Sequence, residues 1–132
     1  MDYRPLRLSP GDDLKVALEQ WFTRAGATAA FVVSGIGSLD RSALRYAGEP
    51  DATALEGRFE ILTLQGTLSA DGAHLHVAIA DARGRVMGGH VKPGCRIATT
   101  AEILIALLPG VRFVREIDAA TGYDELVVRP AV

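Results

Sequence analysis

The sequence predicts a single α+β domain covering residues 1–132, with a twisted, mostly antiparallel sheet of about seven strands and two helices. Three observations predict this class. The length of 132 residues lies in the usual range for one domain, and no repeat or linker divides the chain. Short apolar stretches end at glycine-containing turns, which is typical of strands joined by hairpins. Two other stretches carry the start and stop signals of helices.

The composition limits the classes of function. A hydrophobic content of 48% and a charged content of 23% are ordinary for a globular protein. The 14 basic and 16 acidic residues give a net charge of −2, which disfavours direct DNA binding by the bare domain, since phosphate binding usually needs a basic excess. Cys95 is the only cysteine, so no intrachain disulfide can form. No stretch is typical of a signal peptide or a membrane span, and we expect a cytoplasmic protein with no membrane partner.

The first helix is predicted after residues 9–12, whose Ser-Pro-Gly-Asp sequence supplies start signals. Gly26 is well placed to end it. Apolar residues at helical spacing form one face of this helix, namely Leu14, Leu18, Trp21 and Ala25.

The second helix is predicted over residues 101–108. Thr99 and Glu102 stand at the reciprocal positions of a capping box, and an apolar run follows them. Pro109-Gly110 then stops the helix.

Seven segments are typical of strands, and tight turns order three of them. Asp71-Gly72 and Arg83-Gly84 are hairpin signals, so the three strands around them form an antiparallel meander. Gly35 and Gly37 lack the third glycine and the following helix of a dinucleotide-binding loop, which favours a tight turn or a bulge there. The strand segments are 28–34, 39–46, 58–68, 74–81, 85–91, 111–118 and 125–129.

All three histidines fall in the predicted meander. His74 and His76 are two residues apart in one strand, so their rings project from the same face. His90 belongs to the neighbouring strand. In the simplest register the numbers of paired residues sum to about 167, which puts His90 opposite Val77 and on the other face. A one-residue slip, or a bulge at Gly88-Gly89, would bring all three rings together.

Three neutral imidazoles with an open fourth position are the ligand set of a catalytic-type zinc site. Zinc is therefore the first expectation for His74, His76 and His90, although nickel, iron or copper would also accept these ligands. Glu60, on an adjacent strand, is a candidate further ligand or base, and Cys95 is a weaker candidate ligand. The alternative is that the histidines only form hydrogen bonds at the sheet surface or at a subunit contact.

Other patterns in the sequence give weaker indications of a functional site. No Gly-x-Ser-x-Gly motif marks a nucleophile. Scattered arginines are usually solvated, but four of them could also line an anion pocket. These are Arg7, Arg41, Arg45 and Arg58.

The central motif resembles a known family, the plant and prokaryote conserved (PPC) domain. Residues 57–68 (GRFEILTLQGTL), followed by the His74-Leu75-His76 and Gly88-Gly89-His90 stretches, carry the resemblance. Residues 35–39 and 100–103 add to it, and it extends from about Tyr3 to Val128.

The resemblance implies a twisted, largely antiparallel sheet in a domain that assembles as a homotrimer. Plant members carry the domain beside AT-hook motifs, and prokaryotic members often carry a DNA-binding description. Here the AT-hook core is absent, since Arg83-Gly84-Arg85 is followed by Val86. Two hypotheses follow. One is a trimeric metal-binding domain of unknown substrate, and the other is a non-catalytic oligomerisation and protein-interaction module in transcription regulation.

Overall fold

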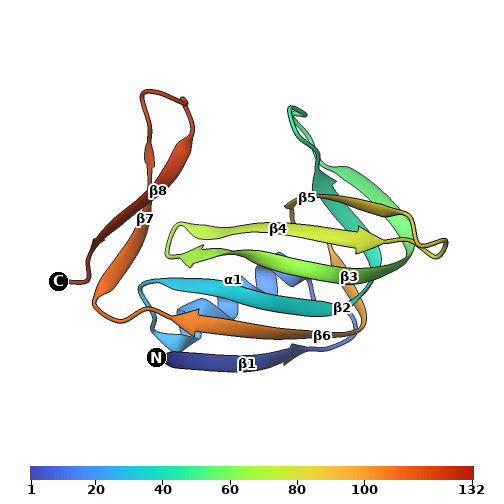
Figure 1. Ribbon diagram of the computed structural model, residues 1–132, viewed down its shortest axis with the longest axis horizontal. Helices are drawn as coiled ribbons and strands as arrows, with labels where there is room; N and C mark the ends of the chain where they lie inside the picture. The colour runs from blue at the N-terminus through green and yellow to red at the C-terminus, as the bar shows by residue number, and fades with distance from the viewer.

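A computed structural model describes the whole chain, residues 1–132, as eight strands and one helix (Figure 1). The elements are β1 (Asp2–Leu8), α1 (Leu14–Ala25), β2 (Ala30–Arg45), β3 (Thr53–Ser69), β4 (Gly72–Ala80), β5 (Val86–Val91), β6 (Arg96–Leu107), β7 (Val111–Ile117) and β8 (Asp124–Pro130). Six strands form one antiparallel sheet in the order β1-β6-β2-β3-β4-β5, and β2 also pairs with β5. The strands β7 and β8 form a separate hairpin.

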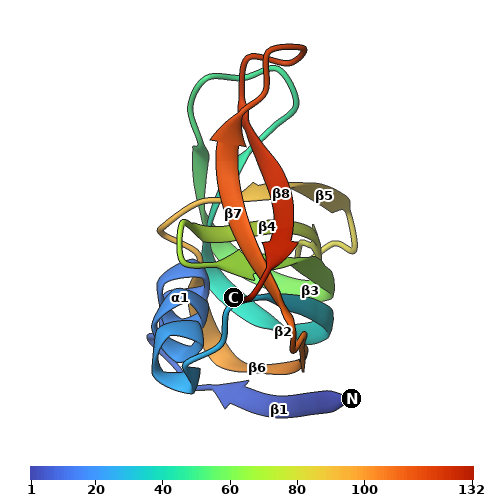
Figure 2. The ribbon, with the colours of Figure 1, turned by 90° about the vertical axis from the view of Figure 1, so that its left-hand side faces the viewer.

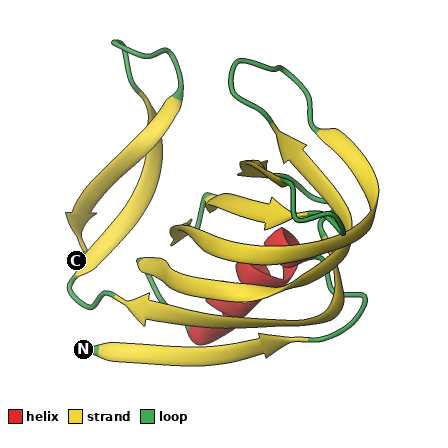
Figure 3. Cartoon of the chain, turned by 45° about the vertical axis from the view of Figure 1, so that its right-hand side comes forward, coloured by secondary structure: helices red, strands yellow, loops and turns green.

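The helix α1 covers one face of the six-stranded sheet, here called the inner face (Figures 2 and 3). Its start is fixed by Asp13, whose side chain accepts a hydrogen bond from the Val16 amide, and Gly26 caps its end as predicted. The buried side chains of the helix are Leu14, Leu18 and Phe22. The predicted face is thus rotated slightly, because Phe22 is buried in the core whereas Trp21 is only partly buried against it. With 12 residues, α1 is too short and too polar to cross a membrane.

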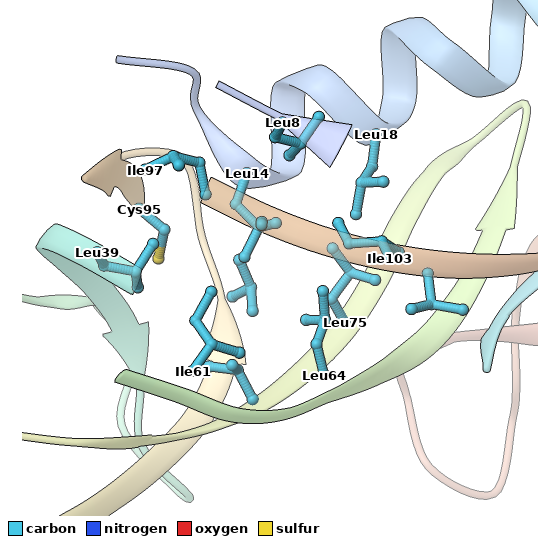
Figure 4. Packing of buried hydrophobic residues seen from close by; sticks show 14 of the residues in the cluster. Leu8, Leu14, Leu18, Leu39, Ile61, Leu64, Leu75, Cys95, Ile97 and Ile103 are labelled. Atoms are coloured by element: carbon cyan, nitrogen blue, oxygen red, sulfur yellow. The ribbon is translucent and has the colours of Figure 1, made fainter. Parts of the chain in front are cut away.

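The core lies between α1 and the inner face of the sheet (Figure 4). Alternate residues of β4 point into it, so Leu75, Val77 and Ile79 are buried while the residues between them are more exposed. Cys95 is fully buried in the same cluster, beside Leu39 and Ile97 in Figure 4. The core therefore occupies one side of the meander and leaves the other side, the outer face, free for other roles.

The predicted second helix is wrong, because residues 96–107 form the strand β6. Ala101, Ile103 and Ile105 are buried at every second position, which is strand and not helix periodicity. β6 lies between β1 and β2 and is hydrogen-bonded on both sides. The residues of the predicted capping box make cross-strand contacts instead. The Thr99 amide donates to the Ser38 hydroxyl, and Glu102 lies opposite Arg7 of β1.

Two further differences account for the strand count of eight. The N-terminal strand β1 was not expected, because its apolar pattern is weak and its partner β6 was assigned to a helix. The predicted strands 28–34 and 39–46 are parts of one long strand, β2. Register shifts lie on either side of Gly35 and Gly37, so these glycines accompany bulges within the strand and do not form a turn.

The hairpin of β7 and β8 stands at one end of the main sheet (Figure 1). Phe113 of β7 is buried and packs edge-on against Phe31 of β2, with ring centroids 5.6 Å apart. Phe31 belongs to the outer face, because its neighbours Ala30 and Val32 are buried in the core. The start of the hairpin therefore lies against the outer face of the sheet.

Candidate metal centre

The register of β4 and β5 brings His76 and His90 directly opposite each other. The simplest register, with Val77 opposite His90, is wrong by one residue, because Val77 pairs with Gly89. The cause is the turn. The Asp81 amide donates to the Arg85 carbonyl and the Gly84 amide to the Asp81 carbonyl, so the connection is one residue longer than the shortest hairpin loop. Gly84, at φ +76°, adopts the left-handed conformation that closes such a loop.

The two glycines before His90 have a different role from the bulge considered for them. Pairing runs without interruption from Ala80 opposite Val86 to His76 opposite His90. A Cβ atom on Gly88 would lie 2.6 Å from the Val77 carbonyl oxygen, and one on Gly89 would lie 2.7 Å from that of Arg45. Both glycines therefore allow close approach of β5 to its neighbours and keep His90 in register.

The three imidazoles gather on the outer face. The ring centroids of His74 and His76 are 5.0 Å apart, those of His74 and His90 4.7 Å, and those of His76 and His90 4.4 Å. One nitrogen from each ring lies within 4.8 Å of the other two. Tetrahedral zinc with three imidazole ligands needs nitrogens about 3.4 Å apart, which small side-chain rotations provide from this starting point. His74 and His90 are half-buried and His76 is exposed, so the cluster is open to solvent.

The electrostatic setting keeps the half-buried rings in the neutral form that metal ligands require. Burial lowers the pKa of His90 to about 4, with His76 and His74 contributing after it. Burial also lowers the pKa of His74, followed by the charge of Arg115 and then by His76. At neutral pH these two imidazoles are therefore neutral and lack the second proton whose charge would repel a cation.

One ring nitrogen of the cluster has no partner. The Nε2 atom of His74 is buried and makes no hydrogen bond within the protein. Its other ring nitrogen, Nδ1, lies 3.2 Å from Nη2 of Arg115, which also donates to the Thr67 hydroxyl at 2.8 Å. A buried polar atom without a partner is costly, and a metal ion among the three rings would give Nε2 its missing contact. The donor set and this unpartnered nitrogen both fit a bound cation.

The structure places the other candidate residues away from the cluster. Glu60 pairs with Ala80, four residues along β4 from His76, which corresponds to about 13 Å of strand. Cys95 is in the core, where its Sγ atom contacts the amide and carbonyl of Ala43 and where burial raises its thiol pKa. Neither residue joins the three histidines.

Cross-strand neighbours extend the cluster with residues that the sequence alone did not single out. On β3, Gln65 lies opposite His76, and Thr67 lies opposite His74. Arg115 comes from β7, 41 residues after His74, and no local pattern could connect the two. Of the four arginines considered for an anion pocket, Arg45 lies opposite His90, whereas Arg7 binds the Thr100 hydroxyl at the other edge of the sheet.

Solved structures share this fold along nearly the entire chain. A hypothetical protein from Salmonella cholerae-suis (Salmonella enterica) is 40% identical with a TM-score of 0.96, covering 99% of this chain and 95% of that one. The metal-containing protein AF0104 from Archaeoglobus fulgidus is 27% identical with a TM-score of 0.81, covering 96% of this chain and 94% of that one.

Curated relatives carry the same domain within longer proteins. The bifunctional protein GlmU of Synechococcus sp. (strain JA-2-3B'a(2-13)) is 51% identical over 126 residues, which are 96% of this chain and 20% of that protein. AT-hook motif nuclear-localized protein 25 of Arabidopsis thaliana is 33% identical over 109 residues, 76% of this chain and 36% of that protein. The chain thus spans about a fifth and about a third of these relatives.

The family model of the Plants and Prokaryotes Conserved (PCC) domain matches residues 4–109. This match includes the helix, the meander with its three histidines and all of β6. The chain belongs to the PCC domain family.

Proposed function

We propose that this chain is a metal-binding domain that holds one divalent ion per protomer through His74, His76 and His90. The observation that carries the proposal is the convergence of three imidazole nitrogens, within 4.8 Å of one another, from two directly paired strands. A similar fold in a protein described as metal-containing supports it. The buried Nε2 of His74, which has no hydrogen-bond partner within the protein, supports it as well.

Zinc is the metal we propose first, because three imidazoles and an open fourth position are a common zinc ligand set. A metal with an open position would supply Lewis-acid chemistry for a small molecule. The residues of this chain hold and shape the site: β4 and β5 fix the ring positions, and Thr67 holds Arg115 beside His74.

We also propose that the domain assembles as a homotrimer. The outer face of β2 and β3 leaves apolar side chains in solvent, including Phe31 at 42% exposure and Leu62 at 48%. The β7–β8 hairpin adds Tyr123 at 73% and Val128 at 57%. Exposed apolar side chains on a sheet and on a projecting hairpin support burial against further copies of the chain.

Elemental analysis of untagged protein, purified without chelator and sized by light scattering, tests both proposals. We expect about one metal ion per chain and a mass of three chains of 14.0 kDa each. The His76→Ala variant should lose the metal and keep the trimer. Gln65→Ala is the matched control, since Gln65 is exposed directly opposite His76 and should leave the metal in place. Wild-type protein that stays metal-free after incubation with zinc, nickel or iron would contradict the metal proposal.

The relationship to AT-hook nuclear proteins favours a second candidate, a non-catalytic oligomerisation and protein-interaction module. It depends on the exposed apolar surface and not on the histidines. Its signature is a stable trimer whose assembly is the same with and without metal, and whose partner binding is lost on substitution of surface residues such as Leu62. A trimer that falls apart on chelation would count against it.

A further inference from the structure

The half-buried guanidinium of Arg115 has no anionic partner. None of the five ion pairs of the protein includes it. Its Nη2 atom contacts Thr67 and His74, but neither Nε nor Nη1 has a hydrogen-bond partner in the protein. Because partial burial of an unpaired charge is costly, the free side of this guanidinium is suited to an anion from outside the chain.

The contact between Arg115 and His74 is compatible only with a metal-free ring. A guanidinium donates hydrogen bonds and cannot accept them, so Nδ1 of His74 accepts here. An imidazole that binds a metal through Nε2 carries its proton on Nδ1 instead. When His74 is a ligand, Arg115 therefore loses this acceptor and needs another one.

The charges around the cluster are predominantly positive. The charge of Arg115 lowers the pKa of His74, and the charges of Arg45 and Lys92 lower the pKa of His90. Glu125 is the one carboxylate whose charge raises the pKa of His74, and it forms no ion pair with Arg115. Asp71 accepts from the backbone amide of Arg115 and not from its guanidinium. Three neutral imidazoles add no charge to offset that of a divalent cation, so a metal here would leave a strongly electropositive site.

We propose that the metal position and the Arg115 guanidinium together bind an oxyanion group, a carboxylate or a phosphate, of a small-molecule ligand. The inference rests on the proposed metal site and names the ligand class for it. One oxygen of such a group suits the open metal position while another accepts from the guanidinium, and a phosphate has a further oxygen for the second arm of the guanidinium fork. Arg45, opposite His90, adds a second positive charge, and Gln65, opposite His76, adds an amide donor on the same face.

Cobalt-loaded protein provides the test. The full chain is stripped of metal and reloaded with Co²⁺, whose visible absorption changes when its ligands change, and metal content is measured in every sample. Sodium phosphate and sodium acetate are then titrated separately into the wild type and the Arg115→Gln, Arg115→Lys and Arg112→Gln variants. Arg112 is the matched control, because it is exposed on the same strand and makes no side-chain hydrogen bond or ion pair.

We expect at least one of the two anions to shift the cobalt spectrum of the wild type and of Arg112→Gln with equal affinity. In Arg115→Gln, which should keep its cobalt, that anion should bind about 10- to 100-fold more weakly, with Arg115→Lys between the two. Binding of acetate alone would assign a carboxylate ligand, and binding of phosphate alone a phosphate ligand. Cobalt-loaded protein that binds neither anion, or binds equally well without Arg115, would overturn this inference and leave the metal site standing. Failure to bind cobalt at all would overturn both.

Discussion

The two faces of β4 are made of alternate residues of one nine-residue strand, yet they have opposite characters. Toward α1, Leu75, Val77 and Ile79 are buried in the apolar core. On the outer face, His74 and His76 meet His90 and Arg115 in the presence of solvent. A shift of register by one residue would exchange the apolar set and the histidines between the two faces. The strand pairing that buries Leu75 therefore also forms the histidine cluster.

Because the two faces differ in this way, we expect stability and metal binding to be separable by substitution. The inner face contributes apolar burial, which dominates the free energy of folding. The outer face contributes metal ligands, and among them His76 is exposed, so its removal leaves no cavity. Changes on the two sides of the same strand should therefore affect different measurements.

The largest effect on stability is expected from Leu75→Ala, because Leu75 is 1% exposed in the core. The substitution should lower the free energy of unfolding by about 3 kcal/mol, through lost burial and the cavity left behind. Denaturant unfolding of metal-free protein measures this. An effect below about 1 kcal/mol would show that the inner face does not carry the fold.

The histidine variants should show the opposite behaviour. His76→Ala should weaken zinc binding by about 100-fold or more. Even the loss of a residue that only hydrogen-bonds to a metal ligand lowers metal affinity by about 10- to 100-fold. The exposed position of His76 means that the metal-free variant should unfold within about 0.5 kcal/mol of the wild type. Calorimetric titration measures the zinc affinity, and denaturant unfolding of the same samples measures the free energy of unfolding. Equal zinc affinity in variant and wild type would show that His76 is not a metal ligand.

Acid should destabilise the metal-free protein because the half-buried His90 of the outer face resists protonation in the folded state. The pKa of His90 is about 4 in the folded protein against 6.5 as its ordinary value, so the unfolded chain binds more protons between these limits. Stability should be constant above pH 6.5 and fall as pH decreases toward 4, by about 1 to 2 kcal/mol after allowance for solvent screening at this half-buried ring. In His90→Gln the slope over this interval should be smaller. An unchanged slope would contradict the assignment.

The smallest effect is expected at the turn that sets the register. Gly84→Ala places a side chain at φ +76°, where nothing lies within 4 Å, so the cost of about 1 kcal/mol is purely conformational. The metal affinity of the folded variant should stay within a few-fold of the wild type, because the strands still fix His76 opposite His90. Thermal unfolding measures the stability of the variant, and zinc titration measures its metal affinity. A large loss of affinity would show that the turn, and not the strand pairing, holds the register.

Much of this arrangement could be predicted from local sequence. The limits of α1, the three-strand meander and the shared face of His74 and His76 follow from spacing and turn residues. Whether His90 shares this face stays open in the sequence, because a single added loop residue reverses the face and the sequence does not show which loop forms. The one-residue slip considered for it is the register that the structure has.

The remaining differences depend on contacts that are distant in the sequence. The segment 101–107 is a strand because β1 and β2 pair with it on both sides, which outweighs a local capping pattern. Arg115 reaches His74 because Phe113 packs on Phe31 and carries β7 to the outer face. Neither effect has a signature in a short stretch of sequence.

Anomalous X-ray diffraction from crystals of zinc-loaded protein, measured on either side of the zinc absorption edge, would locate the metal itself. We expect one strong anomalous peak per chain, about 2.0 to 2.1 Å from a ring nitrogen of each of His74, His76 and His90, on the outer face of the sheet. The same crystals of His76→Ala should lack it. A map without a peak among these three rings, or with zinc bound at another place, would show that the histidine cluster is not the metal site.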